Sequence, residues 1–272
     1  MTISISDKNK LDDAIILNYE VYGEGLPILL IHGFGCDLSL MKEAAEPIFS
    51  KNTQYKRYYI DLPGMGHSSS DVQFASADKI LASVLQFIDT TISEPFLLVG
   101  QSFGGYISSG ILSKLKDKVL SAFLLCPVVL PAHSERTLPQ KNEAYYDHEF
   151  LSILPADKRE DFTSFGVICN EKTFELFEKA IAPGIKNADA TFLEILSLNY
   201  ALSFNPLLPT YNQPITILCG KQDDCVGYQD QFNIIPNYPK SNFFVLDKAG
   251  HNLQIDQPEQ FNYCFENWLK NR

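Results

Sequence analysis

The sequence predicts an α/β fold in which a mostly parallel β-sheet carries helices on both faces. Short apolar runs, most of them without polar–apolar alternation, recur between Gly, Pro and Asp residues, which is typical of strands buried on both faces. Segments with helical spacing of apolar residues separate these runs. Residues 131–209 depart from this alternation, because they show helical patterns and no convincing strand. We therefore expect one sheet that is interrupted by a helical insertion.

Each expected strand is a short apolar run. The runs are Ile15–Tyr22, Ile28–Ile31, Tyr58–Ile60, Phe96–Val99, Ala122–Leu125, Ile215–Cys219 and Phe243–Leu246. The first run mixes polar and apolar residues, so it is predicted to be an antiparallel strand at the edge of the sheet.

Three segments between the runs carry helical signals. Ser76 is a candidate N-cap for a helix whose apolar positions follow i, i+4 spacing. Residues 102–116 are predicted to form a second helix, rich in small residues and with lysines near its end. A third helix is expected to begin within residues 256–259, which supply Asp, Pro and Glu. Its expected buried face consists of Phe261, Phe265, Trp268 and Leu269.

The insertion is bounded by prolines. It begins at Pro131 and closes with Pro206 and Pro209. Two patches within it have helical spacing, namely Phe174, Phe177 and Ile181, and then Phe192, Ile195, Leu196 and Tyr200. A prior of about 150 residues per domain places a chain of this length between one domain and two. The predicted division is a core of residues 1–130 and 210–272 and a helical insertion of residues 131–209.

Composition narrows the class of protein. The 272 residues are 45% hydrophobic and 20% charged, which excludes a disordered chain, a collagen-like repeat and a small disulfide scaffold. Lys+Arg 22 against Asp+Glu 33 gives a net charge of −11. An acidic surface disfavours nucleic acid and anionic membranes as partners.

The chain shows no targeting or metal-binding pattern. Its N-terminus lacks a basic segment followed by an apolar one, and no apolar run approaches the roughly 18 residues of a membrane helix. The six cysteines are scattered and form no CxxC pair. We therefore expect a cytoplasmic protein without membrane insertion and without a zinc site.

The sharpest functional signal is a G-x-S-x-G pattern at residues 100–104, directly after the run Phe96–Val99. Glycines at its flanks remove the Cβ atoms that would clash in a tight turn from strand to helix. The turn presents the Ser102 hydroxyl at a helix N-terminus, where the helix dipole favours developing negative charge. A phosphate-binding loop is the alternative, but no Lys-Ser/Thr follows the glycines.

With this motif the chain resembles the α/β-hydrolase superfamily, whose catalytic residues follow the order serine, acid, histidine. Residues 220–226 match the family's G-x-x-D-x-x-V pattern and make Asp223 the candidate acid, with Asp224 as the adjacent alternative. His251 lies in a Gly-His loop after the last expected strand and is the candidate base.

Two further motifs extend the resemblance over the whole expected core. His32-Gly33 matches the family's HG loop, which implies that the backbone N–H groups of Phe34 and Phe103 form the oxyanion hole. Residues 61–68 match the D-x-P-G-x-G-x-S turn, which is interpreted as structural. The side chains interpreted as scaffold are His32, Asp61, His67, His133 and His148.

The resemblance implies acyl transfer through an acyl-enzyme. His251 takes the proton of Ser102, Asp223 holds the imidazole, and two amides stabilise the tetrahedral oxyanion. An aspartate nucleophile, as in epoxide hydrolases and haloalkane dehalogenases, is disfavoured because position 102 is serine. No cofactor and no metal are implied, the expected partner is a small-molecule substrate, and the oligomeric state stays open.

In this superfamily a helical insertion of this kind commonly forms a cap over the active site. A few of its aromatic residues are expected to line a pocket, and most to pack against the core. These are Tyr145, Tyr146, Phe162, Phe165, Phe174, Phe177, Phe192, Tyr200 and Phe204. Phe34, Phe103 and Leu253 are candidate pocket walls because they flank catalytic positions.

The insertion offers little to bind a charged substrate. Its two arginines, Arg136 and Arg159, lie in no motif, so a small, mainly apolar ester or related acyl compound is expected. The same triad also serves carbon–carbon bond hydrolases, haloperoxidase-like perhydrolases and hydroxynitrile lyases. A non-catalytic receptor for a small ligand is the alternative from a different class.

Overall fold

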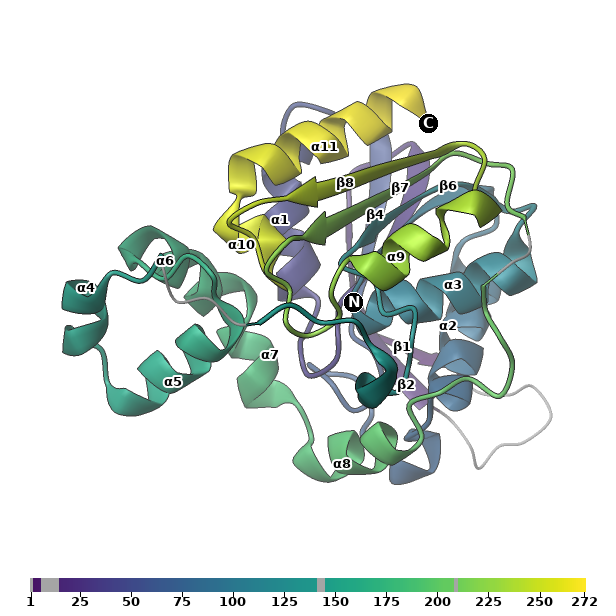
Figure 1. Cartoon of the computed structure of the whole chain (residues 1–272). Helices are drawn as coiled ribbons and strands as arrows, with labels where there is room; N and C mark the ends of the chain where they lie inside the picture. The colour runs from purple at the N-terminus through teal and green to yellow at the C-terminus, as the bar shows by residue number, and fades with distance from the viewer. Residues whose placement is uncertain (1, 6–14, 141–144, 208–209) are drawn as a thin grey trace.

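An eight-stranded sheet forms the centre of the protein (Figure 1), whose computed structural model describes residues 2–5, 15–140, 145–207 and 210–272. Neighbouring strands follow the order β1-β2-β4-β3-β5-β6-β7-β8. The strands are β1 (Thr2–Ile5), β2 (Ile15–Tyr22), β3 (Leu26–Ile31), β4 (Tyr55–Ile60), β5 (Phe96–Gln101), β6 (Val119–Leu125), β7 (Ile215–Gly220) and β8 (Ser241–Leu246). β2 pairs antiparallel with β1 and β4, and every other pair is parallel. The predicted mostly parallel sheet of an α/β fold is confirmed.

The edge position expected for β2 is wrong. The strand is antiparallel, as its mixed composition predicts, but β1 pairs with its outer side in a register that runs from Thr2–Asn18 to Ile5–Ile15. No strand was expected over residues 2–5, because four residues of which only two are apolar carry too little signal. Most of the N-terminal stretch used above, residues 1 and 6–13, lies outside the described residues.

Helices cover both faces of the sheet, as β4 shows by its alternation. Arg57 and Tyr59 point to one face, where both hydrogen-bond to Glu46 of α1. Tyr58 points to the other face, where its ring packs edge-on against Phe87 of α2. The helices of this part are α1 (Ser39–Phe49), α2 (Ala77–Thr91), α3 (Phe103–Leu115), α9 (Gln229–Asn233), α10 (Leu253–Asp256) and α11 (Pro258–Asn271). Single 3₁₀ turns are η1 (Val72–Phe74), η2 (His133–Glu135) and η3 (Ile235–Asn237).

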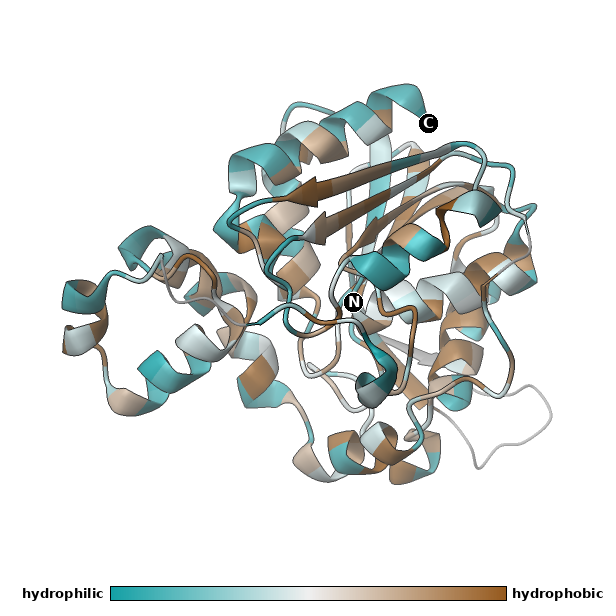
Figure 2. Cartoon of the chain, viewed as in Figure 1, coloured by the Kyte–Doolittle hydropathy of each residue, from teal (hydrophilic) through white to brown (hydrophobic). Residues whose placement is uncertain are grey.

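The predicted helices form with small differences. The Ser76 side chain caps α2 by accepting from the Lys79 N–H at 3.3 Å. The C-terminal helix begins at Pro258, because residues 253–256 form the separate short helix α10. Phe265 and Trp268 of α11 pack on Phe123 of β6, so the predicted apolar face is buried. Figure 2 shows the apolar strands enclosed between helices whose outer sides are polar.

Five α-helices lie between β6 and β7 in the described part of the chain. They are α4 (His148–Ile153), α5 (Ala156–Phe165), α6 (Glu171–Ala180), α7 (Ala182–Asn187) and α8 (Ala190–Leu198). Figure 1 shows α4, α5 and α6 projecting beyond the sheet, while α7 and α8 lead back along it. Helices α6 and α7 contact α1, and α6 also contacts α10. Within the described part of this stretch, the β-pairing is a single isolated bridge between Tyr146 and Cys169. Pro209, the predicted end of the insertion, lies outside the described residues.

None of the helices in the described residues combines the length and the apolar content that a membrane crossing needs.

Candidate active site

Ser102, Asp223 and His251 meet at one edge of the sheet. They follow the carboxyl ends of the parallel strands β5, β7 and β8, and such ends open onto the crevice where α/β proteins bind ligands. His251 Nε2 lies 2.7 Å from Ser102 Oγ, and His251 Nδ1 lies 2.9 Å from Asp223 Oδ2. The structure thus brings together three side chains that the sequence analysis selected from distant parts of the chain.

Ser102 sits in a strained turn between β5 and α3. Its φ of 54° lies in the left-handed region, which costs a non-glycine residue on the order of 1–3 kcal/mol. Main-chain hydrogen bonds hold this conformation. The Ser102 N–H donates to Leu125 O at 3.0 Å, and the Ser102 carbonyl accepts from the N–H groups of Tyr106 and Val128.

The flanking glycines let the new helix approach the neighbouring strands. A Cβ on Gly100 would lie 2.3 Å from Ser108 Oγ, and one on Gly104 would lie 2.4 Å from the His32 carbonyl oxygen. Helix α3 therefore begins directly against the loop that follows β3. The glycines of the G-x-S-x-G pattern are thus required for the packing of α3 against this loop as well as for the turn.

Asp223 is fully buried, and both of its carboxylate oxygens have partners. Oδ2 faces His251, while Oδ1 accepts from the N–H groups of Cys225 and Val226 at 2.9 Å each. These bonds fix the carboxylate behind the imidazole. No hydrogen bond from Asp224 to His251 occurs in the described residues, so the geometry favours Asp223 over the adjacent alternative.

The environment of His251 makes it a strong base. Burial alone would lower the pKa of the imidazole, but the Asp223 carboxylate and the neighbouring Cys225 outweigh burial and raise this pKa well above its usual value. Because a carboxylate only accepts hydrogen bonds, Nδ1 carries the proton in the neutral ring. Nε2 is then free to accept the hydrogen of the Ser102 hydroxyl.

The backbone amides of Phe34 and Phe103 are the predicted oxyanion donors, and the structure describes the loops that carry them. Phe103 is the first residue of α3, so its N–H has no acceptor within the helix. The loop of Phe34 is held by His32, whose Nδ1–H donates to Gly33 O at 2.7 Å and whose Nε2 accepts from Leu62 N–H at 2.9 Å. Burial lowers the pKa of His32, which keeps this ring neutral and suited to one donor and one acceptor role.

The predicted D-x-P-G-x-G-x-S turn is organised by Asp61. Its carboxylate accepts hydrogen bonds from the Leu38 and His67 N–H groups and from the Asn18 side chain. These contacts connect the turn to β2 and to the start of α1, which agrees with a structural reading of the turn.

A cavity of about 750 Å³ opens onto Ser102 and His251. Its lining is mainly apolar and includes Phe34, Val128, Pro131, Phe165, Ile185, Leu193, Leu198 and Tyr200. Of the three candidate wall residues, Phe34 lies on this lining and Phe103 and Leu253 do not. Both of the latter are fully buried, and the Phe103 ring packs beneath Phe34 and Tyr200.

The aromatic residues of the insertion were expected to pack mostly against the core, but four of the nine, Phe162, Phe165, Phe174 and Phe177, pack with one another. Phe162 contacts Phe174 and Phe177, and together they form a small core among α5 and α6. Phe165 and Tyr200 are the two candidates from that set that line the cavity in the described residues.

Sequence reasoning assigned no site role to four polar residues that line the cavity. They are His133, which was interpreted as scaffold, Arg136, Ser197, and Cys225, which occupies an unspecified position of the 220–226 pattern. For all but Ser197, burial and orientation depend on how the segment after β6 folds back over the loop after β7, and local sequence does not report this. The scarcity of arginine in the insertion was the single available signal for Arg136.

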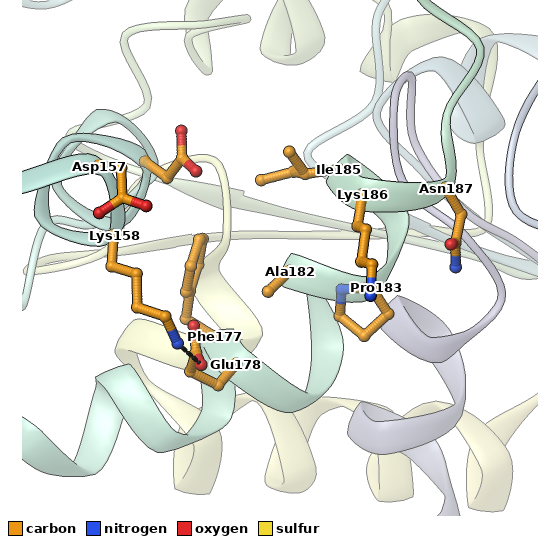
Figure 3. Close-up of a pocket in the computed structure, with 10 residues that line it drawn as sticks. Asp157, Lys158, Phe177, Glu178, Ala182, Pro183, Ile185, Lys186 and Asn187 are labelled. Atoms are coloured by element: carbon orange, nitrogen blue, oxygen red, sulfur yellow. Dashed lines mark hydrogen bonds and ion pairs between the residues drawn. The ribbon is translucent and has the colours of Figure 1, made fainter. Parts of the chain in front are cut away.

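A second hollow, of about 760 Å³, lies between α5, α6 and α7, away from these residues. Figure 3 shows Lys158 of α5 reaching toward Glu178 of α6, with which it forms an ion pair. Ile185 lines both hollows. Among the described residues, none of the candidate catalytic side chains lines the second hollow.

One group near the triad has the composition of a metal site. Ligand atoms of Cys126, Asp223 and His251 lie within 4.8 Å of one another. Zinc binds thiolates, whereas burial raises the pKa of the Cys126 thiol well above its usual value. Asp223 and His251 already hydrogen-bond to each other. These features favour a protonated thiol beneath the Asp223–His251 pair.

The family model and two curated relatives that match this chain are all named as hydrolases or lipases. The model of the alpha/beta hydrolase family matches residues 28–262. The monoacylglycerol lipase ABHD6 of Bos taurus is 22% identical over 247 residues, covering 86% of this chain and 72% of that protein. The (E)-2-((N-methylformamido)methylene)succinate hydrolase of Acinetobacter baylyi is 24% identical over 267 residues, covering 98% of each.

Solved structures agree in fold. An alpha/beta superfamily hydrolase from Oenococcus oeni PSU-1 is 33% identical with a TM-score of 0.87, covering 93% of this chain and 95% of that chain. A thermophilic esterase from Thermogutta terrifontis has a TM-score of 0.72 at 22% identity, covering 99% and 98%. At that identity the second likeness concerns the fold alone.

Proposed function

The chain belongs to the alpha/beta hydrolase family, and within it we propose a serine hydrolase with Ser102 as nucleophile, His251 as base and Asp223 as acid. The continuous hydrogen-bonded chain from Asp223 through His251 to Ser102, open to a cavity, carries this proposal. Neither a cofactor nor a metal is needed, because these residues supply the nucleophile and the proton transfers themselves.

The reaction proceeds in two steps. His251 Nε2 takes the hydroxyl proton while Ser102 Oγ attacks the substrate carbonyl, and the imidazolium then gives this proton to the leaving group. The N–H groups of Phe34 and Phe103 donate to the oxyanion of each tetrahedral intermediate. Water, activated by His251 in the second step, releases the acyl group and restores Ser102.

The proposed substrate is a small, mainly apolar carboxylic ester or related acyl compound. A cavity of about 750 Å³ with a mostly apolar lining suits such a compound. We assign residues 131–209 to a cap and residues 1–130 and 210–272 to the catalytic core. Six cavity-lining residues from Phe165 to Leu198 support the cap, because five lie in the helices between β6 and β7 and the sixth, Ala188, directly follows α7.

A fluorophosphonate probe tests the nucleophile. The wild-type protein is expected to be labelled and to hydrolyse short neutral esters, whereas Ser102→Ala loses both properties. Ser197→Ala is the matched control, because Ser197 lines the same cavity without a contact to His251, and it should be labelled like the wild type. A folded wild-type protein that is not labelled and turns over no ester would refute the hydrolase and favour a receptor.

A further inference from the structure

Arg136 carries the sole permanent charge among the described residues that line the cavity. No aspartate, glutamate or lysine of the described residues shares this lining. The protein as a whole has the opposite sign, with a net charge of −11. The charge of Arg136 is therefore opposite in sign to the net charge of the protein and stands alone among the described residues of this wall, which suggests a role for it in ligand binding.

The hydrogen bonds of Arg136 orient its guanidinium without neutralising it. Nε donates to Leu130 O at 2.9 Å, Nη1 to Cys225 O at 3.0 Å and Nη2 to Pro131 O at 3.0 Å. No carboxylate oxygen of the described residues lies within ion-pair distance of Arg136. A guanidinium has five N–H groups, of which three make these bonds and one is within reach of the Tyr200 hydroxyl, so at least one remains for a ligand.

Tyr200 completes this polar corner of the cavity. Burial raises the pKa of its hydroxyl, and the adjacent Arg136 guanidinium partly offsets that effect. The hydroxyl therefore stays protonated and offers a neutral donor or acceptor next to the cation. Both residues line the cavity, so a ligand that enters it can reach them.

Cys225 contacts both the Arg136 guanidinium and the proposed base, His251. The Cys225 carbonyl accepts from Arg136, while the His251 imidazole interacts with the Cys225 side chain and lowers the pKa of its thiol. Asp223, the nearest buried acid behind His251, has both oxygens occupied. A half-buried cation without an anionic partner is unfavourable, and a carboxylate would satisfy it through short, charge-assisted bonds.

We propose that the substrates of this site carry a carboxylate, which Arg136 and Tyr200 bind while the ester lies against Ser102. This inference rests on the proposed function and sharpens its substrate class, from a mainly apolar ester to an apolar chain with an anionic end. The apolar lining formed by Leu193 and Leu198 remains available for the chain between the two groups.

The kinetic test uses pairs of ethyl esters that differ in one terminal group. Monoethyl adipate ends in a carboxylate, and ethyl hexanoate has the same chain with a methyl end. Monoethyl esters from succinate to suberate, each paired with the ethyl ester of the same chain with a methyl end, test the effect of chain length. The wild type is expected to prefer the anionic member in kcat/KM, and Arg136→Gln to reduce that preference about 10–100-fold, as expected for loss of a charged hydrogen bond.

Two further variants separate charge recognition from a structural role. If Arg136 only supports the main chain, Arg136→Gln lowers kcat/KM for both esters equally, and the proposal is overturned. Arg136→Lys keeps the charge and is expected to recover part of the anionic preference. Arg159→Gln is the charge-matched control, because Arg159 is exposed on α5 outside the cavity, and it should leave the preference unchanged.

A binding measurement keeps the test independent of turnover. Isothermal titration of Ser102→Ala with hexanoate and with hexanol should show binding of the carboxylate that Ser102→Ala/Arg136→Gln loses. Equal binding of both compounds overturns the anion site even if the esters are hydrolysed. Carboxylate binding without fluorophosphonate labelling of the wild type would instead refute the hydrolase alone.

Discussion

Asp256 joins the proposed cap to the loop of the proposed base. Its Oδ1 accepts from the N–H groups of Val167 and Ile168 at 3.1 and 2.9 Å, and its Oδ2 accepts from Gly250 N–H at 2.9 Å. Gly250 directly precedes His251. The carboxylate is 5% exposed, and burial raises its pKa from 3.8 to about 6, against the effect of the three N–H donors.

This raised pKa predicts a pH dependence of stability with a definite sign. Between the unfolded pKa of 3.8 and the folded pKa of about 6, the folded protein binds the proton more tightly than the unfolded chain. The contribution of Asp256 to stability is therefore fully present below 3.8 and is lost as the pH rises through 6. Integrating the difference in bound protons from about pH 5 to about pH 7.5 gives a loss of about 1.4 kcal/mol.

Asp256→Asn removes this titration while keeping one side-chain oxygen for Val167 and Ile168. Its amide NH₂ would face the Gly250 N–H, so the variant is expected to be less stable than the wild type at both pH values. The deficit should be larger near pH 5 than near pH 7.5, by about 1.4 kcal/mol.

Urea unfolding followed by the fluorescence of Trp268, the single tryptophan, measures both free energies. The exposed Asp117→Asn is the matched control and should follow the wild type at both pH values. A deficit that is constant with pH, or larger at the higher pH, would refute a raised pKa of Asp256 as its source.

Three other predictions concern the proposed acid, the pKa of His251 and the turn at Ser102. Asp223→Asn should lower kcat about 10⁴-fold, whereas Asp224→Asn should leave it within a few fold; the reverse result would reassign the acid. In the wild type kcat/KM should fall as the pH drops through the raised pKa of His251, and Asp223→Asn should move this acid limb to lower pH, because the carboxylate raises that pKa. Gly104→Ala should destabilise the fold by at least about 1–3 kcal/mol in urea unfolding, since its Cβ would lie 2.4 and 2.5 Å from main-chain carbonyl oxygens. Gly110→Ala is the milder control, because its Cβ meets the mobile end of a leucine side chain, and equal unfolding midpoints for the two variants would contradict this account.

The parts of the fold that local sequence encodes were predictable. A strand buried on both faces is apolar throughout, so the parallel strands were located to within a few residues of their observed ends. The turn at Ser102 needs glycines at fixed positions, which makes it visible as a motif. Helix α1 was missed because Pro47 lies inside it and obscures the helical pattern.

The parts that depend on contacts between distant segments were not predictable. Whether a side chain lines the cavity or packs in the core depends on the direction in which it points. The sequence motif predicts only the position of its main chain. Phe103 illustrates this, since it directly follows Ser102 in the chain while its ring is fully buried and lies outside the cavity lining. Arg136 illustrates the opposite case, because its place beside Cys225 follows from a contact across 89 positions of the chain.

Two charged residues that join the proposed cap to the rest of the chain contact the loops that carry the proposed acid and base. Arg136 donates to the carbonyl of Cys225, whose own N–H donates to Asp223, and Asp256 joins residues 167 and 168 to Gly250 beside His251. A shift of the cap therefore acts on both loops through hydrogen bonds. Displacement of a catalytic group by about 1 Å can lower the rate about 10²-fold. Binding at Arg136 is thus expected to affect kcat as well as KM, because the side chain proposed to hold the substrate also holds the loop of the proposed acid.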